Sequence, residues 1–237
     1  MTFSDSDPAG LDQFVGQLKE LLELQKDWGR PFLLRSKKIR EASSLIGRPA
    51  GHFESLSDLH RAIAVCQKCR LFRHRLQTVP GQGAPNSRLM FIGEGPGFEE
   101  DQQGFPFVGP AGQLLTKMIR AINLHREEVF ITNVVKCRPP ENRLPLEYEV
   151  EACRPFIEEE IRLVDPQILV PLGNCAAQAL TRSKNKISSL RGRLLDINGR
   201  QLIPSYHPAY LLRNPDAKRE AWEDLKKIRR IYDGLDK

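Results

Sequence analysis

The chain has 237 residues, 40% of them hydrophobic, and its apolar runs are short. This excludes a membrane-spanning helix, which needs about 20 apolar residues. Lys and Arg number 36 against 30 Asp and Glu, a net charge of +6, which permits a polyanionic partner without requiring one. The acidic, polar N-terminus lacks the basic and apolar regions of a secretory signal, so we expect a cytoplasmic protein with no membrane partner.

Residues 11–27 carry apolar side chains at helical spacing, with a polar opposite face, which predicts an amphipathic helix. The basic stretch 30–51 contains two prolines and is typical of a linker. We therefore expect residues 1–55 to form an N-terminal helical extension. Two interpretations stay open: an extension that packs on the main domain or is partly disordered, and a helix that docks a protein partner.

From about residue 56 to 237 the pattern is that of one α/β domain. We expect helices over 57–65, 110–122, 145–164, 173–180 and 217–232, and strands over 89–92, 129–135, 168–172 and 202–205. Strands that alternate with helices predict a mostly parallel sheet covered on both faces. Polar segments follow three of the strands, at 93–104, 133–143 and 206–213. Because ligands bind beyond the carboxyl ends of such strands, these segments should meet at one crevice.

Five cysteines are an odd number, and clustered cysteines in a reducing compartment are more often metal ligands than disulfides. Four of them fit tetrahedral zinc or a [4Fe–4S] cluster equally well by count: Cys66, Cys69, Cys137 and Cys153. Their spacing disfavours a zinc ribbon, because the last two do not form a second Cys-x2-Cys pair. The alternative is that all four are free thiols. We expect Cys175 to be a packing residue.

The first polar segment contains Gly93–Gly97 with Glu94, Glu99, Glu100 and Asp101 close by. A phosphate-binding glycine loop would avoid this negative charge. Carboxylates here suit the stabilisation of a cation or the positioning of water, or they form a solvated acidic loop. In the next loop, Phe107 is either a core residue or a platform that stacks on a flat ring.

Asn133 comes late in a predicted strand, where its amide can read the edge of a base or satisfy a turn. Lys136, Arg138 and Arg143 follow it and can contact phosphates. His207 ends the last strand, and an imidazole there can stabilise a developing anion. Behind it, Leu211 or Leu212 can wedge into a base stack and Arg213 can hold a phosphate.

Four features together closely resemble the iron–sulfur uracil-DNA glycosylases, family 4 of that superfamily. They occur in order over about residues 64–232: the four-cysteine pattern, GEGPGFEEDQQGFPFVGPAGQLL (93–115), NVVKCRPPENRLP (133–145) and HPAYLLR (207–213). The resemblance implies a three-layer α/β/α fold with a central four-stranded parallel sheet. It also implies a structural [4Fe–4S] cluster held by the four cysteines, and removal of uracil from single- or double-stranded DNA in base excision repair.

The resemblance further implies the roles of individual residues. Phe107 would stack on the flipped uracil, Asn133 would read its edge, and His207 would bond the departing oxygen. The backbone beside Glu94, at Gly95, would contact uracil, and Glu100 would crowd the 5-methyl group of thymine.

Two departures from the wider superfamily bear on the mechanism. Other branches carry an Asp where this chain has Gly95, so no strong general base is implied. A related branch carries a basic insertion with an extra His that traps DNA covalently. The corresponding segment here, residues 140–145, is short and contains no His. We therefore expect turnover by a monomeric, monofunctional glycosylase associated with the nucleoid. The alternatives are a non-catalytic DNA-damage-binding module and a zinc-stapled nucleoside hydrolase.

Overall fold

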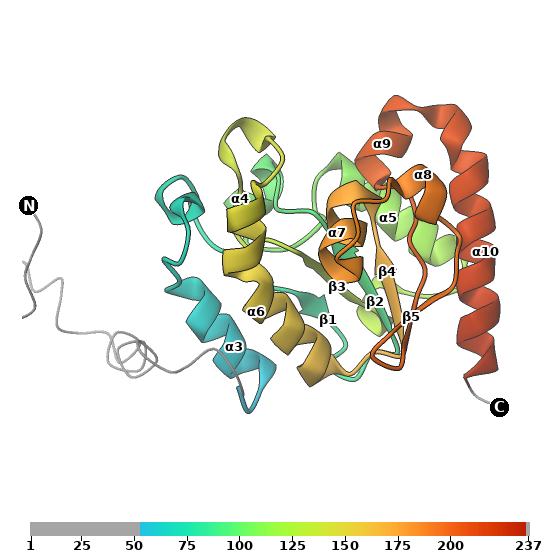
Figure 1. Ribbon diagram of the computed structural model, residues 1–237, viewed down its shortest axis with the longest axis horizontal. Helices are drawn as coiled ribbons and strands as arrows, with labels where there is room; N and C mark the ends of the chain where they lie inside the picture. Colours follow the sequence, from blue (N-terminus) through green and yellow to red (C-terminus); the bar gives the residue numbers. More distant parts are fainter. Residues whose placement is uncertain (1–52, 236–237) are drawn as a thin grey trace, which may run out of the picture. The chain divides into compact units, whose positions relative to one another are not determined.

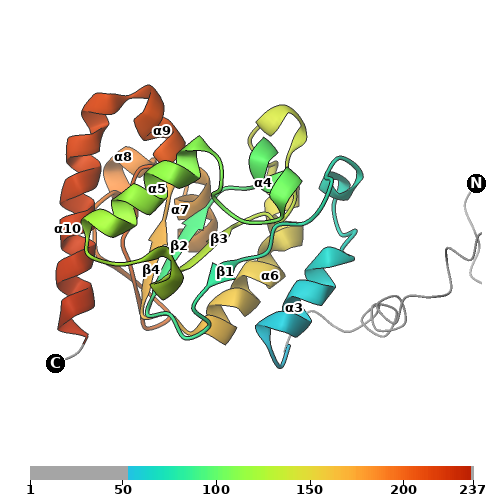
Figure 2. The same ribbon diagram turned by 180° about the vertical axis from the view of Figure 1, so that it is seen from behind.

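The computed structural model describes residues 53–235 (Figures 1 and 2). Within this range six strands form one sheet: β1 (Gln82–Gly83), β2 (Leu89–Gly93), β3 (Phe130–Asn133), β4 (Ile168–Pro171), β5 (Leu195–Ile197) and β6 (Arg200–Leu202). The α-helices of the described part are α3 (Leu56–Ala64), α4 (Phe98–Gln103), α5 (Pro110–Ala121), α6 (Glu147–Val164), α7 (Gly173–Thr181), α8 (Ile187–Leu190), α9 (Pro208–Arg213) and α10 (Lys218–Gly234). The amphipathic helix expected over 11–27 lies outside the described residues.

The sheet has the order β1-β3-β2-β4-β6-β5. Its four central strands pair in parallel, as expected, while β1 and β5 pair antiparallel at the two edges. The expected four parallel strands are therefore confirmed as the centre of the sheet, but the sheet of the described residues is six-stranded and mixed. Each edge strand is only two or three residues long, too short to leave a periodic signal in the sequence. The fourth predicted strand is also displaced, because β6 ends at Leu202 and only Ser205 bridges back to Leu172.

Helices cover both faces of the sheet, which gives three layers (Figures 1 and 2). Alternate residues of β2 point to opposite sides. Leu89 and Phe91 join a core formed with α5, α9 and α10, while Met90 and Ile92 join one formed with α3, α6 and α7. Such doubly covered strands consist of continuous apolar runs, as β2 and β4 do.

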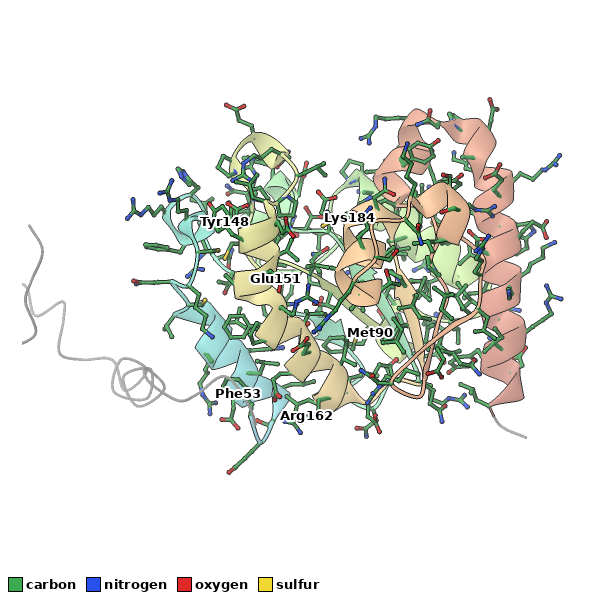
Figure 3. The ribbon with its side chains drawn as sticks, viewed as in Figure 1. Phe53, Met90, Tyr148, Glu151, Arg162 and Lys184 are labelled. Carbon is green, nitrogen blue, oxygen red and sulfur yellow. The ribbon has the colours of Figure 1, made fainter. Side chains whose placement is uncertain are left out.

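The described part begins with α3, which lies against α6. Its N-cap is Ser55, whose hydroxyl accepts the Asp58 N–H, two residues before the expected start at Ser57. Just upstream, Phe53 donates its N–H to Glu159 at 3.2 Å and accepts from Arg162 at 2.6 Å. Figure 3 shows Phe53 and Arg162 near each other at the far end of α6. These bonds fasten the chain to α6 where the domain begins.

A buried ion pair joins α6 to the end of β3. Lys136 Nζ lies 2.6 Å from Glu160 Oε2, and both side chains are at most 1% exposed. Lys136 Nζ also donates to Thr132 Oγ1 at 2.7 Å and to the Asn133 carbonyl at 2.6 Å. Glu160 accepts from Thr132 Oγ1 and from the Gly81 N–H. Buried charges persist where they are paired and fully hydrogen-bonded, as these are.

We expect Glu160→Gln to destabilise the domain strongly, because it leaves the Lys136 ammonium buried without a counter-charge. Removal of one partner of a buried pair costs about 3–5 kcal/mol, which for a chain of this size lowers the melting temperature by about 10 °C. Thermal unfolding followed by circular dichroism measures this.

The double variant Lys136→Met/Glu160→Leu is the matched control, because it removes both charges. It should recover most of the lost melting temperature. Equal destabilisation of the single and double variants would show that the charge pairing is not what matters.

Candidate active site

One large crevice opens at the carboxyl ends of the parallel strands. Its volume is about 1330 Å³, and the segments that follow β2, β3, β4 and β6 all contribute to its lining. Six of the predicted site residues lie in it, as do two of the predicted phosphate contacts: Glu94, Gly95, Glu100, Phe107, Asn133 and His207, with Arg143 and Arg213. Its volume exceeds the roughly 300–1,000 Å³ of ordinary small-molecule pockets, so there is room for more than one small ring.

Gly93, the last residue of β2, brings two of these side chains together. A Cβ at this position would lie 2.3 Å from Asn133 Oδ1 and 2.5 Å from Phe107 Cζ. Both side chains therefore pack directly against the Gly93 backbone, and any larger residue there would displace them. Asn133 is the last residue of β3 and pairs with Gly93 across the sheet, so its position is set by strand register.

The Asn133 side-chain oxygen is the most informative atom of the crevice. Asn133 is 2% exposed, and among the described residues its Oδ1 has no hydrogen-bond partner. An unsatisfied buried acceptor costs about 1–3 kcal/mol. Its place in the crevice lining points to a donor that a ligand would bring.

Phe107 stands on a strained backbone beside this oxygen. Its φ of 54° lies in the left-handed region, which is unfavourable for an aromatic residue. The carbonyl of Phe107 approaches Gly112 so closely that a Cβ there would lie 1.8 Å away. Phe107 is 6% exposed, and its ring centroid lies 5.6 Å from that of His207, with the planes 33° apart.

His207 caps α9. Its Nδ1 accepts the Ala209 N–H at 3.1 Å, so a neutral ring carries its proton on Nε2. Burial, followed by the charge of Arg213, lowers the pKa of His207 to about 4. At neutral pH the ring is therefore an uncharged imidazole whose free nitrogen is a hydrogen-bond donor.

The carboxylates of the first motif have different environments. Burial raises the pKa of Glu94 to about 7. Glu100 is buried and accepts the N–H groups of Gly97, Val108 and Gly109 at 2.9–3.0 Å, which ties the loop carrying Phe107 to the start of α4. Asp101 is 1% exposed and accepts the N–H groups of Leu76 and Gln77. The interpretation of this segment as a solvated acidic loop is therefore wrong for Glu100 and Asp101, whereas Glu99 is exposed.

Two of the predicted DNA contacts are buried, and a third lies outside the lining of the crevice. Lys136 is 1% exposed and committed to Glu160, so it cannot reach a phosphate. Leu211 is 1% exposed and belongs to the core, whereas Leu212 is 45% exposed. Arg138 lies outside the crevice lining, with its guanidinium carbon 5.0 Å from the ring centroid of Phe98.

The crevice also contains residues that sequence reasoning missed. Figure 3 shows Glu151 on α6 and Lys184 on the segment after α7, and both line the crevice. Arg154, Tyr206, Tyr210 and Phe98 do so as well. Of these, only Phe98 has a local sequence signal that could have indicated it, because it is an aromatic residue within the acidic motif.

The four predicted ligand cysteines line a separate, small pocket between α3 and α6, together with Phe72, Phe156 and Arg75. Arg75 Nη1 lies 2.9 Å from Cys137 Sγ, and the Lys136 N–H lies 3.3 Å from Cys153 Sγ. No group of three or more His, Cys, Asp and Glu side chains within residues 53–235 is arranged to hold a metal ion. Cys175 lies apart from the others, in the crevice.

In residues 53–235, none of the helices has the length and apolar character needed to cross a lipid bilayer.

Comparison with known proteins identifies the family. Residues 80–226 match the model of the uracil DNA glycosylase superfamily. A type-4 uracil-DNA glycosylase of Sulfurisphaera tokodaii is 42% identical over 75% of this chain and 85% of its own length, and one of Thermotoga maritima is 41% identical over 74% and 94%. A type-5 enzyme of Pyrobaculum aerophilum is only 30% identical, over 64% and 74%. The chain thus belongs to the uracil DNA glycosylase superfamily and, within it, to the type-4 uracil-DNA glycosylases.

Proposed function

We propose that this type-4 uracil-DNA glycosylase excises uracil that has been flipped out of DNA into the crevice. Water replaces uracil at C1′ of the deoxyribose, and the N1–C1′ bond breaks, so that an abasic site and free uracil remain. Extrusion of the base costs a few kcal/mol, less where it is mismatched or unpaired. The reaction is the first step of base excision repair of deaminated cytosine.

The observation that carries this proposal is the unpaired Asn133 oxygen. Uracil presents an N3–H donor between two carbonyl acceptors, and that donor can satisfy Asn133 Oδ1. Cytosine presents an acceptor at N3, which would leave the asparagine oxygen unpaired and repelled. A site that hydrogen-bonds a polar group of its substrate discriminates strongly against an analogue without that group. An apolar pocket discriminates much less between ligands that differ only in size.

Phe107 and His207 complete the base site. The rigidly held Phe107 ring supplies a flat face on which uracil stacks. The Nε2–H of neutral His207 donates to a uracil carbonyl as negative charge develops on the departing base. A donor fixed before the reaction needs no reorganisation when that charge appears.

Charges of both signs act on the sugar and its phosphates. The Glu94 carboxylate, once ionised, stabilises the cationic character that grows at C1′. Glu100 acts as a positioning residue through the three amides it holds, and Gly95 leaves no side chain to activate water. Arg213 and Arg143 hold phosphates, and the exposed Leu212 fills the gap left in the base stack.

We expect His207→Ala to lower the rate of uracil release by about 10²–10³ with the fold intact, since one preorganised donor is lost. Alkali cleavage of a labelled oligonucleotide with a single U·G pair measures this. The matched control is His125→Ala, at an exposed histidine outside the crevice, which should retain full activity. A folded wild-type protein that binds this DNA without cleaving it would favour the damage-binding module instead.

Activity should rise with pH through about 7, the pKa of Glu94, because burial keeps this carboxyl protonated and neutral below that value. Below it the rate should fall about tenfold per pH unit. His207, with its pKa near 4, adds no change until far lower pH. Single-turnover rates of the wild type and Glu94→Gln measure this. If the variant kept the same acidic limb, Glu94 would not be its source.

We further propose that Cys66, Cys69, Cys137 and Cys153 hold a [4Fe–4S] cluster. Two observations support it. All four thiols line one apolar pocket, and N–H groups of Arg75, Lys136 and Lys68 lie 2.9–3.5 Å from three of the sulfur atoms, as suits thiolates. A multi-atom cluster also spaces its ligands more widely than a single zinc ion would. Bound there, it would link the segment after α3 to α6, with no part in the glycosidic reaction.

Cys137→Ser should therefore lose iron and the brown colour of the protein, and it should unfold at a lower temperature. Iron and sulfide analysis, visible absorption and thermal unfolding measure these changes. Cys175→Ser is the matched control and should keep all three properties. Stoichiometric zinc in place of iron in the anaerobically purified protein would contradict the assignment.

A further inference from the structure

Phe98 is an exposed aromatic side chain at the edge of the crevice. It is the first residue of α4 and is 51% exposed. The buried residues of α4 are the carboxylates Glu100 and Asp101, while Phe98 and the third acidic residue, Glu99, are exposed. Packing of the helix therefore does not explain Phe98.

Arg138 covers the Phe98 ring. Its guanidinium carbon lies 5.0 Å from the ring centroid, and its Nε donates to Asn142 Oδ1 at 2.7 Å, which fixes the orientation of the planar group. Arginine over an aromatic face is a favourable arrangement. Since half of the Phe98 surface stays exposed, the pair presents a flat apolar face next to a positive charge.

We propose that Phe98 and Arg138 form a stacking platform for the nucleobase next to the flipped uracil in single-stranded DNA. This rests on the proposed function, since the uracil must occupy the Asn133 site. The crevice extends from that site to Phe98, and its volume leaves room for a second ring. Aromatic platforms beside positive charge accept any base, because every base has a flat face. In duplex DNA the neighbouring base stays paired and stacked within the helix, so it gains little from the platform.

The test compares Phe98→Ala with the wild type on single-stranded and duplex substrates of one sequence. Single-turnover assays over a range of enzyme concentrations separate binding from chemistry. On single strands the half-saturating enzyme concentration should rise about tenfold, the order expected for loss of one stacked base, and the saturating rate should not change. On duplex DNA the rise should be much smaller. Phe98→Trp should behave as the wild type, and Trp222→Ala, at an exposed aromatic on α10 outside the crevice, is the matched control.

A second measurement identifies the contact directly. The base on the 5′ or the 3′ side of the uracil is replaced by an abasic analogue, and binding is compared for both proteins. If Phe98 stacks on the base at one of these two positions, an abasic analogue at that position should weaken wild-type binding as much as Phe98→Ala does. The same analogue should not weaken binding by the Phe98→Ala variant any further. The platform would be overturned if, at both positions, the abasic analogue weakened binding by the variant as much as binding by the wild type. It would also be overturned if Phe98→Ala weakened binding equally on single strands and duplexes. Absence of uracil release by the wild type would instead overturn the proposed function, and these binding comparisons would still decide whether the platform exists.

Discussion

The buried pair of Lys136 and Glu160 is the interaction on which both halves of the molecule depend. The ammonium bonds the backbone of Asn133, and the residue bearing it is followed at once by Cys137. The carboxylate reaches the Gly81 amide and the Thr132 hydroxyl as well. One pair of charges therefore fixes the end of β3, which carries the Asn133 side chain proposed to read the base, and the start of the segment that leads into the cysteine pocket. Removal of either charge would leave the other one buried without a counter-charge.

Carboxylates also organise the loops around the crevice. Loops that carry a site have few apolar contacts to hold them, so their backbone amides need other partners. Glu100 and Asp101 supply these partners from inside a short helix. This reduces the conflict of an acidic motif in a protein that binds a polyanion. The carboxylates of Glu100 and Asp101 are turned inward and bonded to amides, although Glu99 is exposed, and burial raises the pKa of Glu94 to about 7.

The sequence predicted the parts of the fold that have a period: the four parallel strands, the long helices and the convergence of polar segments at one edge. It could not predict features that depend on distant partners. Lys136 sits in a basic stretch and is typical of a phosphate contact, yet its partner Glu160 lies on the next helix. Leu211 and Leu212 differ only by their phase on α9, a six-residue helix in the segment that the sequence marks only as polar. The exposure of Phe98 follows from the inward turn of its acidic neighbours, which is a tertiary effect.

The unpaired oxygen of Asn133 has a consequence for turnover. In the proposed function Asn133 Oδ1 accepts the uracil N3–H, and it is then as complementary to the free base as to the base still attached to DNA, because bond cleavage does not alter that edge. Phe107 is likewise indifferent to whether the sugar is attached. Groups that bind reactant and product equally do not accelerate the chemical step, but they slow dissociation of the product. If the site acts as proposed, the groups that make it selective should also make free uracil an inhibitor, and product release should contribute to the turnover rate.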